Sequence, residues 1–297
     1  MKSLSGKQVF LTGAASGIGL ALAVQLAEAG SHLFLVDISE SGLQLLKNQL
    51  ADRPVQVTTH VCDLSDPAAV SRAVARALEV TGGIDLLINN AGVAYYGATE
   101  AMTAEQWNWL LSINLLAPIQ ITRELLPSLL ERPDTHIVNM CSISGIVAGG
   151  RFAAYHTSKF GLIGFTEAIR AEYGRRGIGV TAMCPGPVTT KLYQSAASGR
   201  SDREVPTPPA WLCASPEHVA RVTLKAIRKN RRQVLITPMA HALYQLKRFA
   251  PGLIDLMNQF SRSKKKRQAA LEAAFRERMK DSAPMTEQRP RSDQRAA

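Results

Sequence analysis

The sequence has no hydrophobic run long enough to cross a membrane as a helix. The first apolar run covers only residues 9–13, whereas a membrane-spanning helix needs about 20 apolar residues. The residues that precede it, from Met1 to Lys7, lack the apolar stretch of a secretory signal. We therefore expect no signal peptide and a cytoplasmic protein, which could still bind a membrane peripherally.

Cysteine is scarce, with four residues in 297, namely Cys62, Cys141, Cys184 and Cys213. They lie in or beside apolar segments, and their spacing matches no metal-binding motif. The pattern argues against a zinc site and against a disulfide framework. It is typical of buried free thiols in a reducing compartment, so we expect no bound metal.

The charge balance is uneven along an otherwise ordinary globular composition. The chain is 46% hydrophobic and 20% charged, with a formal net charge of +11. Residues 261–297 contain eleven Lys/Arg against five Asp/Glu, a net charge of +6. The composition predicts one folded domain that is only mildly basic, followed by a basic extension with its own role or a role in solubility alone.

Short apolar runs alternate with stretches of helical spacing from the first residues to about position 236. Alternating strands and helices predict right-handed crossovers and a parallel sheet with helices on both faces. The fold class is therefore α/β, a doubly wound parallel seven-stranded sheet of the Rossmann type. The predicted strands cover 8–12, 32–36, 55–61, 85–88, 135–140, 179–183 and 233–236. The predicted helices cover 17–29, 40–50, 67–80, 104–130, 153–174 and 216–229.

Three regions follow from this order of elements. Residues 1–237 are predicted to form the α/β domain, 238–281 a helical basic extension and 282–297 a disordered tail. Within the domain, the loop 188–209 is rich in Ser, Thr and Pro. A loop of this length is either a mobile lid over the substrate or a surface insertion.

A glycine-rich loop follows the first predicted strand and opens the first helix, with Gly13, Gly17 and Gly19 around Ser16 and Ile18. The first glycine permits a turn, the second lets the backbone approach phosphates, and the third lets helix and strand pack closely. Backbone N–H groups and the helix dipole favour a pyrophosphate there. The loop alone is a weak signal, because glycines also occur in such turns for steric reasons.

Asp37 ends the second predicted strand, where a carboxylate can bind a ribose 2′-OH and would repel a 2′-phosphate. This position favours NAD over NADP as the cofactor. Asp37 could instead cap the following helix, a role for which Ser39 is an equally good candidate. Asp63 and the segment 89–92 also follow predicted strands, at the sheet edge where α/β proteins bind ligands.

Tyr155 and Lys159 stand four residues apart at the start of a predicted helix, so they share one face. A nearby ammonium stabilises a phenolate, and a lowered pKa would make Tyr155 a usable acid and base near neutral pH. Ser142 follows the fifth predicted strand and could hold a substrate oxygen. Ser142 could equally be the cap of a turn.

In their order along the chain, these motifs resemble those of the short-chain dehydrogenase/reductase family over residues 6 to about 236. The motifs are the glycine loop, Asn89-Asn90-Ala91-Gly92, Asn114, Ser142, the Tyr155–Lys159 pair and residues 185–190. The resemblance implies that residues 1–237 form a dinucleotide-binding catalytic domain. It also implies an oxidoreductase that transfers a hydride between a nicotinamide cofactor and an alcohol or carbonyl. Related proteins commonly form homo-oligomers, which we expect here as well.

The resemblance also implies residue roles. Tyr155 would be the general acid and base, Lys159 would lower its pKa and bind the nicotinamide ribose, and Ser142 would orient the substrate oxygen. Asn114 would hold a water in a proton relay, while Thr12 and Asn90 would brace the loop. The implied cofactor contacts are Gly13, Ser16, Gly17, Ile18, Gly19, Asp37, Asp63, Leu64, Asn90, Ala91, Gly92, Tyr155, Lys159, Pro185, Gly186, Val188 and Thr190.

Two positions depart from the usual family pattern. Met140 and Cys141 precede the serine where relatives often have a small polar residue, and Arg151 places a charge ahead of Tyr155. Arg151 would either meet an anionic substrate or remain a solvated surface charge.

The extension combines apolar helical spacing over 239–260, broken at Pro251-Gly252, with the basic run 262–267. This pattern suits docking of residues 239–267 on an anionic membrane surface, and it equally suits helices packed on the pocket or on a partner subunit. Nucleic-acid binding is disfavoured, because the run has no aromatic interleaving. Either placement of the helices makes a lipophilic alcohol, of steroid, retinoid or long-chain type, the expected substrate.

A catalytically silent NAD(H)-binding sensor or scaffold that acts through the tail is the alternative function. The complete set of Asn114, Ser142, Tyr155 and Lys159 argues against it, because a silent relative has no physical need for all four.

Overall fold

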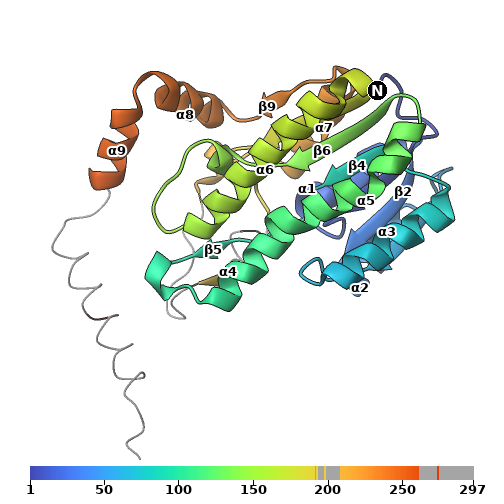
Figure 1. Ribbon diagram of the computed structural model, residues 1–297, viewed down its shortest axis with the longest axis horizontal. Helices are drawn as coiled ribbons and strands as arrows, with labels where there is room; N and C mark the ends of the chain where they lie inside the picture. The colour runs from blue at the N-terminus through green and yellow to red at the C-terminus, as the bar shows by residue number, and fades with distance from the viewer. Residues whose placement is uncertain (191, 193–196, 199–207, 261–272, 274–297) are drawn as a thin grey trace, which may run out of the picture. The chain divides into compact units, whose positions relative to one another are not determined.

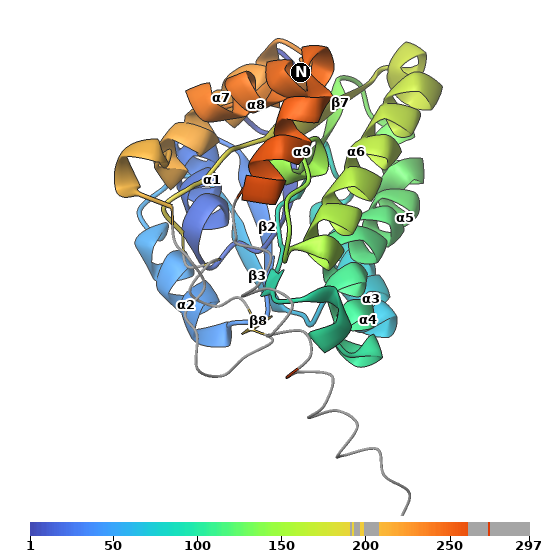
Figure 2. The same ribbon diagram turned by 90° about the vertical axis from the view of Figure 1, so that its left-hand side faces the viewer.

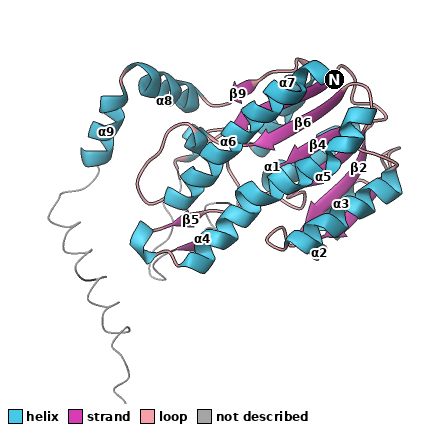
Figure 3. Cartoon of the chain, in the orientation of Figure 1, coloured by secondary structure: helices cyan, strands magenta, loops and turns pink. Residues whose placement is uncertain are grey.

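The computed structural model describes residues 1–190, 192, 197–198, 208–260 and 273 (Figure 1). The chain divides into two compact units, 1–253 and 254–297, which are described separately. Helices and strands alternate along the first unit, as Figure 3 shows by colour.

The first unit contains a seven-stranded sheet in the order β3-β2-β1-β4-β6-β7-β9, with every neighbouring pair parallel. This arrangement confirms the predicted fold class and all seven predicted strands, with ends that differ by one or two residues. The strands are β1 (Gln8–Thr12), β2 (His32–Asp37), β3 (Val57–Val61), β4 (Leu86–Asn89), β6 (Thr135–Met140), β7 (Ile178–Cys184) and β9 (Gln233–Leu235).

Helices cover both faces of this sheet (Figure 2). One apolar core lies between the strands and α1, α2 and α7, and a second lies between the strands and α3, α5 and α6. The central strands β6 and β7 are buried along their whole length, which explains why they read as continuous apolar runs. The helices are α1 (Gly17–Glu28), α2 (Glu40–Gln49), α3 (Pro67–Thr81), α4 (Ala104–Leu111), α5 (Ala117–Glu131), α6 (Ala153–Tyr173) and α7 (Pro216–Arg228).

The predicted helix 104–130 is divided by a π-helical turn, η2 (Ser112–Leu116), between α4 and α5. Thr103 begins α4 with a capping box, in which its side chain accepts from Gln106 N and the Gln106 side chain accepts from Thr103 N. The π-helical turn was not predicted, because a single-turn widening leaves the apolar spacing almost unchanged.

Buried amide side chains tie the centre of the sheet to α6. Asn89 at the end of β4 donates to Asn139 Oδ1 of β6 at 2.8 Å, and Asn139 donates to Thr166 Oγ1 of α6 at 2.9 Å. All three residues are buried. Because buried hydrogen bonds are directional, this chain of bonds fixes how far α6 slides along the sheet.

After β9, Thr237 caps α8 (Pro238–Phe249), and α9 (Pro251–Phe260) follows. The predicted break at Pro251 is therefore confirmed. The Lys247 ammonium of α8 donates to Ile146 O and lies 4.6 Å from the centre of the Phe160 ring. The helix α8 thus packs beside Ile146 and beside Phe160 of α6, although the Phe249 side chain is 77% exposed.

Several predicted features fall outside the described residues, namely the basic run 262–267, the tail 282–297 and most of the loop 188–209. Within that loop, β8 (Ala197–Ser198) pairs with β5 (Tyr95–Tyr96). In the part of the chain that the structure describes, no helix is long and apolar enough to cross a membrane. Cys62, Cys141 and Cys184 are buried as predicted, whereas Cys213 is partly exposed.

The carboxylate of Asp85, just before β4, joins the amino ends of the central strands. It accepts from Gln8 N at 2.8 Å and Arg132 Nε at 3.0 Å, and Lys7 Nζ lies at 3.5 Å. Burial alone would raise the pKa of Asp85, but the hydrogen bonds from Arg132 and Gln8 and the nearby Lys7 charge outweigh it and lower the pKa.

We expect Asp85→Asn to lower the free energy of unfolding by roughly 2 kcal/mol at pH 7, because it loses hydrogen bonds to a charged group. A lowered folded-state pKa gives stability above the unfolded value of about 4 and loses it as the pH falls further. The deficit of the variant, measured by urea unfolding, should therefore shrink between pH 5 and about pH 2. The control Glu79→Gln removes an exposed ion pair with Arg76 and should cost under about 0.5 kcal/mol. A deficit independent of pH would contradict this account.

Candidate functional site

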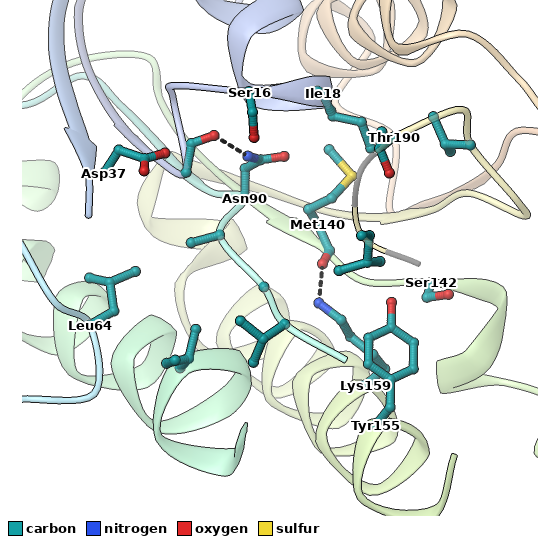
Figure 4. A pocket seen from close by; sticks show the side chains of 18 of the residues that line it. Ser16, Ile18, Asp37, Leu64, Asn90, Met140, Ser142, Tyr155, Lys159 and Thr190 are labelled. Atoms are coloured by element: carbon teal, nitrogen blue, oxygen red, sulfur yellow. Dashed lines mark hydrogen bonds between the residues drawn. The ribbon is translucent and has the colours of Figure 1, made fainter. Parts of the chain in front are cut away.

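A cavity of about 410 Å³ opens at the carboxyl ends of the strands. Figure 4 shows Asp37 and Ser16 toward one end of it, and Tyr155, Lys159 and Ser142 together toward the other. Every residue predicted for the site lines this cavity except Gly19 and Asn114, which lie behind its wall. The lining predicted from sequence is Gly13, Ser16, Gly17, Ile18, Asp37, Asp63, Leu64, Asn90, Ala91, Gly92, Ser142, Tyr155, Lys159, Pro185, Gly186, Val188 and Thr190.

The glycine loop passes very close to neighbouring backbone. Gly13 has φ +65°, and a Cβ there would lie 2.8 Å from Ala91 Cα. A Cβ on Gly19 would overlap the carbonyl oxygen of Gly13. Both positions therefore require glycine, the first for its left-handed backbone and the second for the close approach of α1 to the loop.

The amino end of α1 faces the cavity with its first N–H groups. Ser16 precedes the helix with extended backbone, and in this part of the described chain its side chain makes no capping hydrogen bond. The first turn of α1 also contains no acidic residue. The positive end of the helix dipole is therefore available to an anion from outside the chain.

Thr12 and Asn90 hold the loop against β4. Thr12 Oγ1 accepts from Asn90 N at 3.0 Å and Ala91 N at 3.1 Å. The Asn90 amide group donates to the carbonyl oxygens of Thr12 and Gly13, and Figure 4 draws one of these two bonds. These four bonds fix the loop before any ligand arrives.

The Asp37 carboxylate lies at the end of β2 and is held by backbone amides. Oδ2 accepts from Ala15 N and Oδ1 from Ser39 N, each at 2.9 Å. Ser39 caps α2 by accepting from Gly42 N, so the capping role falls to Ser39. Asp63 uses one oxygen in the same way for the N–H and hydroxyl groups of Ser65.

Lys159 is the buried charge of the site, with 3% of its surface exposed. Its Nζ donates to Met140 O of β6 at 2.9 Å and lies 5.7 Å from the centre of the Tyr155 ring. Burial lowers the pKa of Lys159. The ammonium, the phenol and the Ser142 hydroxyl thus meet at one wall of the cavity (Figure 4).

Ser142 both lines the cavity and caps a turn. Its Oγ accepts from Ser144 N at 3.0 Å, at the start of the 3₁₀ turn η3 (Ile143–Gly145). This bond uses a lone pair of the hydroxyl, so the O–H remains able to donate to a ligand. Ser142 can therefore cap the turn and donate to a substrate oxygen at the same time.

Asn114 lies in the π-helical turn η2 and is fully buried. Its amide exchanges two hydrogen bonds of 2.8 Å with the Val93 backbone and donates to Ser158 Oγ at 3.2 Å. The side chain therefore braces the segment after β4 against α6, and a role in holding water stays a prediction.

Sequence reasoning missed the apolar part of the lining. Val93, Trp109 and Ile113 also line the cavity, as does Leu192 of the loop 188–209. Trp109 and Ile113 are four residues apart, and this spacing predicts that they share one side of a helix. It does not predict that this side lines the cavity. Arg151 is absent from the described lining. Its guanidinium instead lies 5.6 Å from the centre of the Tyr96 ring, on a backbone with φ +74°.

Comparison with known proteins agrees with this geometry. The family model for short chain dehydrogenases matches residues 7–201. A "CLA biosynthesis dehydrogenase/reductase" of Lactiplantibacillus plantarum is 32% identical over 266 residues, which cover 82% of this chain and 93% of the relative. The chain therefore belongs to the short-chain dehydrogenase/reductase family of oxidoreductases.

Two solved structures share the fold. A short-chain dehydrogenase/reductase from Burkholderia phymatum, solved in complex with NAD, has a TM-score of 0.77 at 26% identity and covers 85% of this chain and 96% of its own. The apo form of LigO from Sphingobium has a TM-score of 0.71 at 30% identity and covers 96% of this chain and 100% of its own.

We expect Gly13→Ala to weaken binding of NADH roughly tenfold, equivalent to about 1.4 kcal/mol. The alanine is strained by a left-handed backbone and also meets Ala91, so the loop must shift. Gly164→Ala on α6 is the matched control, because a Cβ there meets nothing within 4 Å. The measurement is a fluorescence titration with NADH, and equal affinities of the two variants would refute the tight-loop account.

Proposed function

We propose that the protein is an NAD-dependent oxidoreductase that interconverts an alcohol and its carbonyl compound. One observation carries the proposal: a buried ammonium, a phenol and a serine hydroxyl share one wall of a cavity that has a glycine loop at its other end. This arrangement serves proton transfer beside a dinucleotide, and it has no evident purpose in a purely structural wall.

The residues present fit a nicotinamide dinucleotide. The α1 amino end offers N–H groups without an acidic neighbour in its first turn, and the braced glycine loop leaves room for phosphates. Pro185 to Thr190 continue the wall toward Tyr155, and Ile143 N donates to Pro185 O at 2.9 Å. When bound, the nicotinamide ring supplies the hydride acceptor or donor.

The chain's own groups would handle the proton and the substrate oxygen. In oxidation, the Tyr155 oxygen takes the proton of the alcohol hydroxyl, and in reduction it returns a proton to the carbonyl oxygen. The Lys159 ammonium favours the phenolate form by its charge. The Ser142 hydroxyl donates to the substrate oxygen and orients it.

The preference for NAD rests on Asp37. Its carboxylate lines the cavity at the end distant from Tyr155, and its negative charge would repel a 2′-phosphate while still accepting from a ribose hydroxyl. Its bonds to Ala15 N and Ser39 N hold the carboxylate in place.

The substrate is proposed to be lipophilic. Val93, Trp109, Ile113 and Leu192 line the same cavity as Tyr155, and apolar lining favours apolar substrates. A steroid, a retinoid or a long-chain alcohol fits this description. The name of the Lactiplantibacillus relative, which refers to CLA biosynthesis, is compatible with such a class.

The silent-sensor alternative predicts cofactor binding without turnover. Homo-oligomer formation and docking of residues 239–267 on an anionic membrane stay predictions. The contact of Lys247 with Ile146 favours packing of α8 beside the pocket over its insertion in lipid.

We expect Tyr155→Phe to lower kcat by roughly 10²- to 10⁴-fold with NAD, because the general acid and base is lost. Absorbance at 340 nm would be followed with a panel of lipophilic and polar alcohols. Tyr173→Phe, at the far end of α6, is the control and should keep its activity. Turnover by Tyr155→Phe at the wild-type rate would contradict the mechanism, and bound NADH with no turnover by the wild type on the whole panel would favour the sensor.

We expect Asp37→Asn to shift the ratio of NADP to NAD affinity by roughly tenfold toward NADP, because the repelling charge is removed. Equilibrium titration with both reduced cofactors would measure the ratio. Asp52→Asn, at an exposed position, should leave the ratio unchanged. If Asp37→Asn also leaves it unchanged, the selectivity lies elsewhere.

A further inference from the structure

The segment that follows Ser142 determines where the serine hydroxyl lies relative to Tyr155. After the turn η3, the chain runs through Ile146 to Gly149 before α6 begins at Ala153. Ser142 comes from the end of β6 and Tyr155 from the first turn of α6. The spacing of the two hydroxyl groups therefore depends on how this connecting segment is held to α6, in addition to the bond of Lys159 to Met140 O.

His156, the residue after Tyr155, bridges two points of that segment. Its Nδ1 lies 2.8 Å from Ser144 O, and its Nε2 accepts from Gly149 N at 3.0 Å. The side chain is buried, with 9% of the residue exposed. Its ring stands edge to face with Phe152, which packs in turn against Tyr155.

These two partners allow only one form of the imidazole. Ser144 O is an acceptor and therefore requires a proton on Nδ1. Gly149 N–H is a donor and therefore requires a bare lone pair on Nε2. The neutral ring with its proton on Nδ1 satisfies both partners, whereas the imidazolium would bring two N–H groups together at Gly149.

From this geometry we propose that neutral His156 is a positioning residue that clips the Ser142–Gly149 segment to α6 and so sets the serine hydroxyl against Tyr155. The catalytic part of this proposal rests on the proposed function, while the clip itself does not. His156 touches neither substrate nor cofactor in this role and acts through Ser142.

A second contact reaches the same segment from the other side. Lys247 of α8 donates to Ile146 O, between the two points that His156 holds, and covers the Phe160 ring. Lys247 is also the charged group that faces His156 from outside α6. On its own helix, Tyr155 directly precedes His156, and Lys159 follows it three residues later.

The protonation state follows from these surroundings. Burial is the largest influence and lowers the pKa of His156, the hydrogen bond to Ser144 O raises it, and the Lys247 charge lowers it, with a net downward shift from 6.5. The clip is therefore complete at pH 7 and is lost as the pH falls through the lowered value.

The clip can be tested without any substrate, on full-length protein labelled with ¹⁵N. Long-range ¹⁵N–¹H spectra should show His156 as the neutral Nδ1–H tautomer at pH 7. Its protonation at acid pH should accompany lower protection of residues 142–150 from amide exchange, once the pH dependence of the intrinsic exchange rate is divided out. A neutral Nε2–H tautomer, or a charged ring at pH 7, would overturn the proposal whether or not an alcohol is turned over.

Two variants separate positioning from a merely structural role. His156→Phe keeps a ring but loses both bonds, and should lower kcat roughly 10- to 100-fold with NADH affinity and KM within about threefold. His156→Asn retains a donor for Ser144 O and should recover part of kcat. For carbonyl reduction, the wild-type kcat should fall at acid pH as the clip is lost, and this fall should be absent in His156→Asn.

Thr157→Ala is the control, because the Thr157 side chain is next to His156 in the sequence and is exposed. This variant should match the wild type in kcat and in amide exchange of residues 142–150. If His156→Phe keeps the wild-type exchange rates, the clip is refuted. If kcat and NADH affinity fall together with the melting temperature, His156 is a structural residue and the positioning role is refuted.

Discussion

The buried ammonium of Lys159 is the constraint around which the rest of the site is arranged. Moving such a charge out of water costs several kcal/mol unless fixed dipoles replace the solvent. Here Met140 O supplies one hydrogen bond at 2.9 Å, which forces α6 to lie against the end of β6. The amide chain from Asn89 through Asn139 to Thr166 fixes the same two elements a few residues away. These bonds therefore hold α6 at one position along the sheet, and that position determines where Tyr155 lies.

The two ends of the cavity are made rigid by different means. At the glycine loop, backbone groups are fixed by Thr12 and Asn90, and close approach leaves no space for side chains. Near Tyr155, side chains from four segments meet, namely the end of β6, the start of α6, the α4–η2 run and the chain after β7. The first end suits a ligand common to many enzymes. The second depends on loops and helix faces that a family can vary while the sheet stays constant.

The sequence predicted the sheet, and it predicted that the polar candidate residues gather at one edge of that sheet, because both follow from local patterns. Fully buried strands such as β6 and β7 must be continuous apolar runs, and residues at the ends of parallel strands must meet at one edge. Trp109 and Val93 escaped prediction because their direction depends on how α4 packs across the sheet, which is a tertiary property. The sequence could not decide whether Asp37 or Ser39 caps α2, since either residue type can cap a helix, and the structure shows that Ser39 does so. The position of α8 beside η3 had no local signal.

The π-helical turn η2 determines which face of the preceding helix, α4, is directed at the cavity. An α-helix turns by about 100° for each residue, so a wide turn with one additional residue rotates α4 about its axis relative to α5. This rotation brings Trp109 and Ile113 to the cavity while Asn114 faces Val93 and Ser158. The turn therefore determines the rotation of α4 about its own axis. Losing one residue from η2 would leave α4 helical, yet a different row of its side chains would face the substrate. Pocket shape in this chain is thus encoded in a residue count as well as in residue identity.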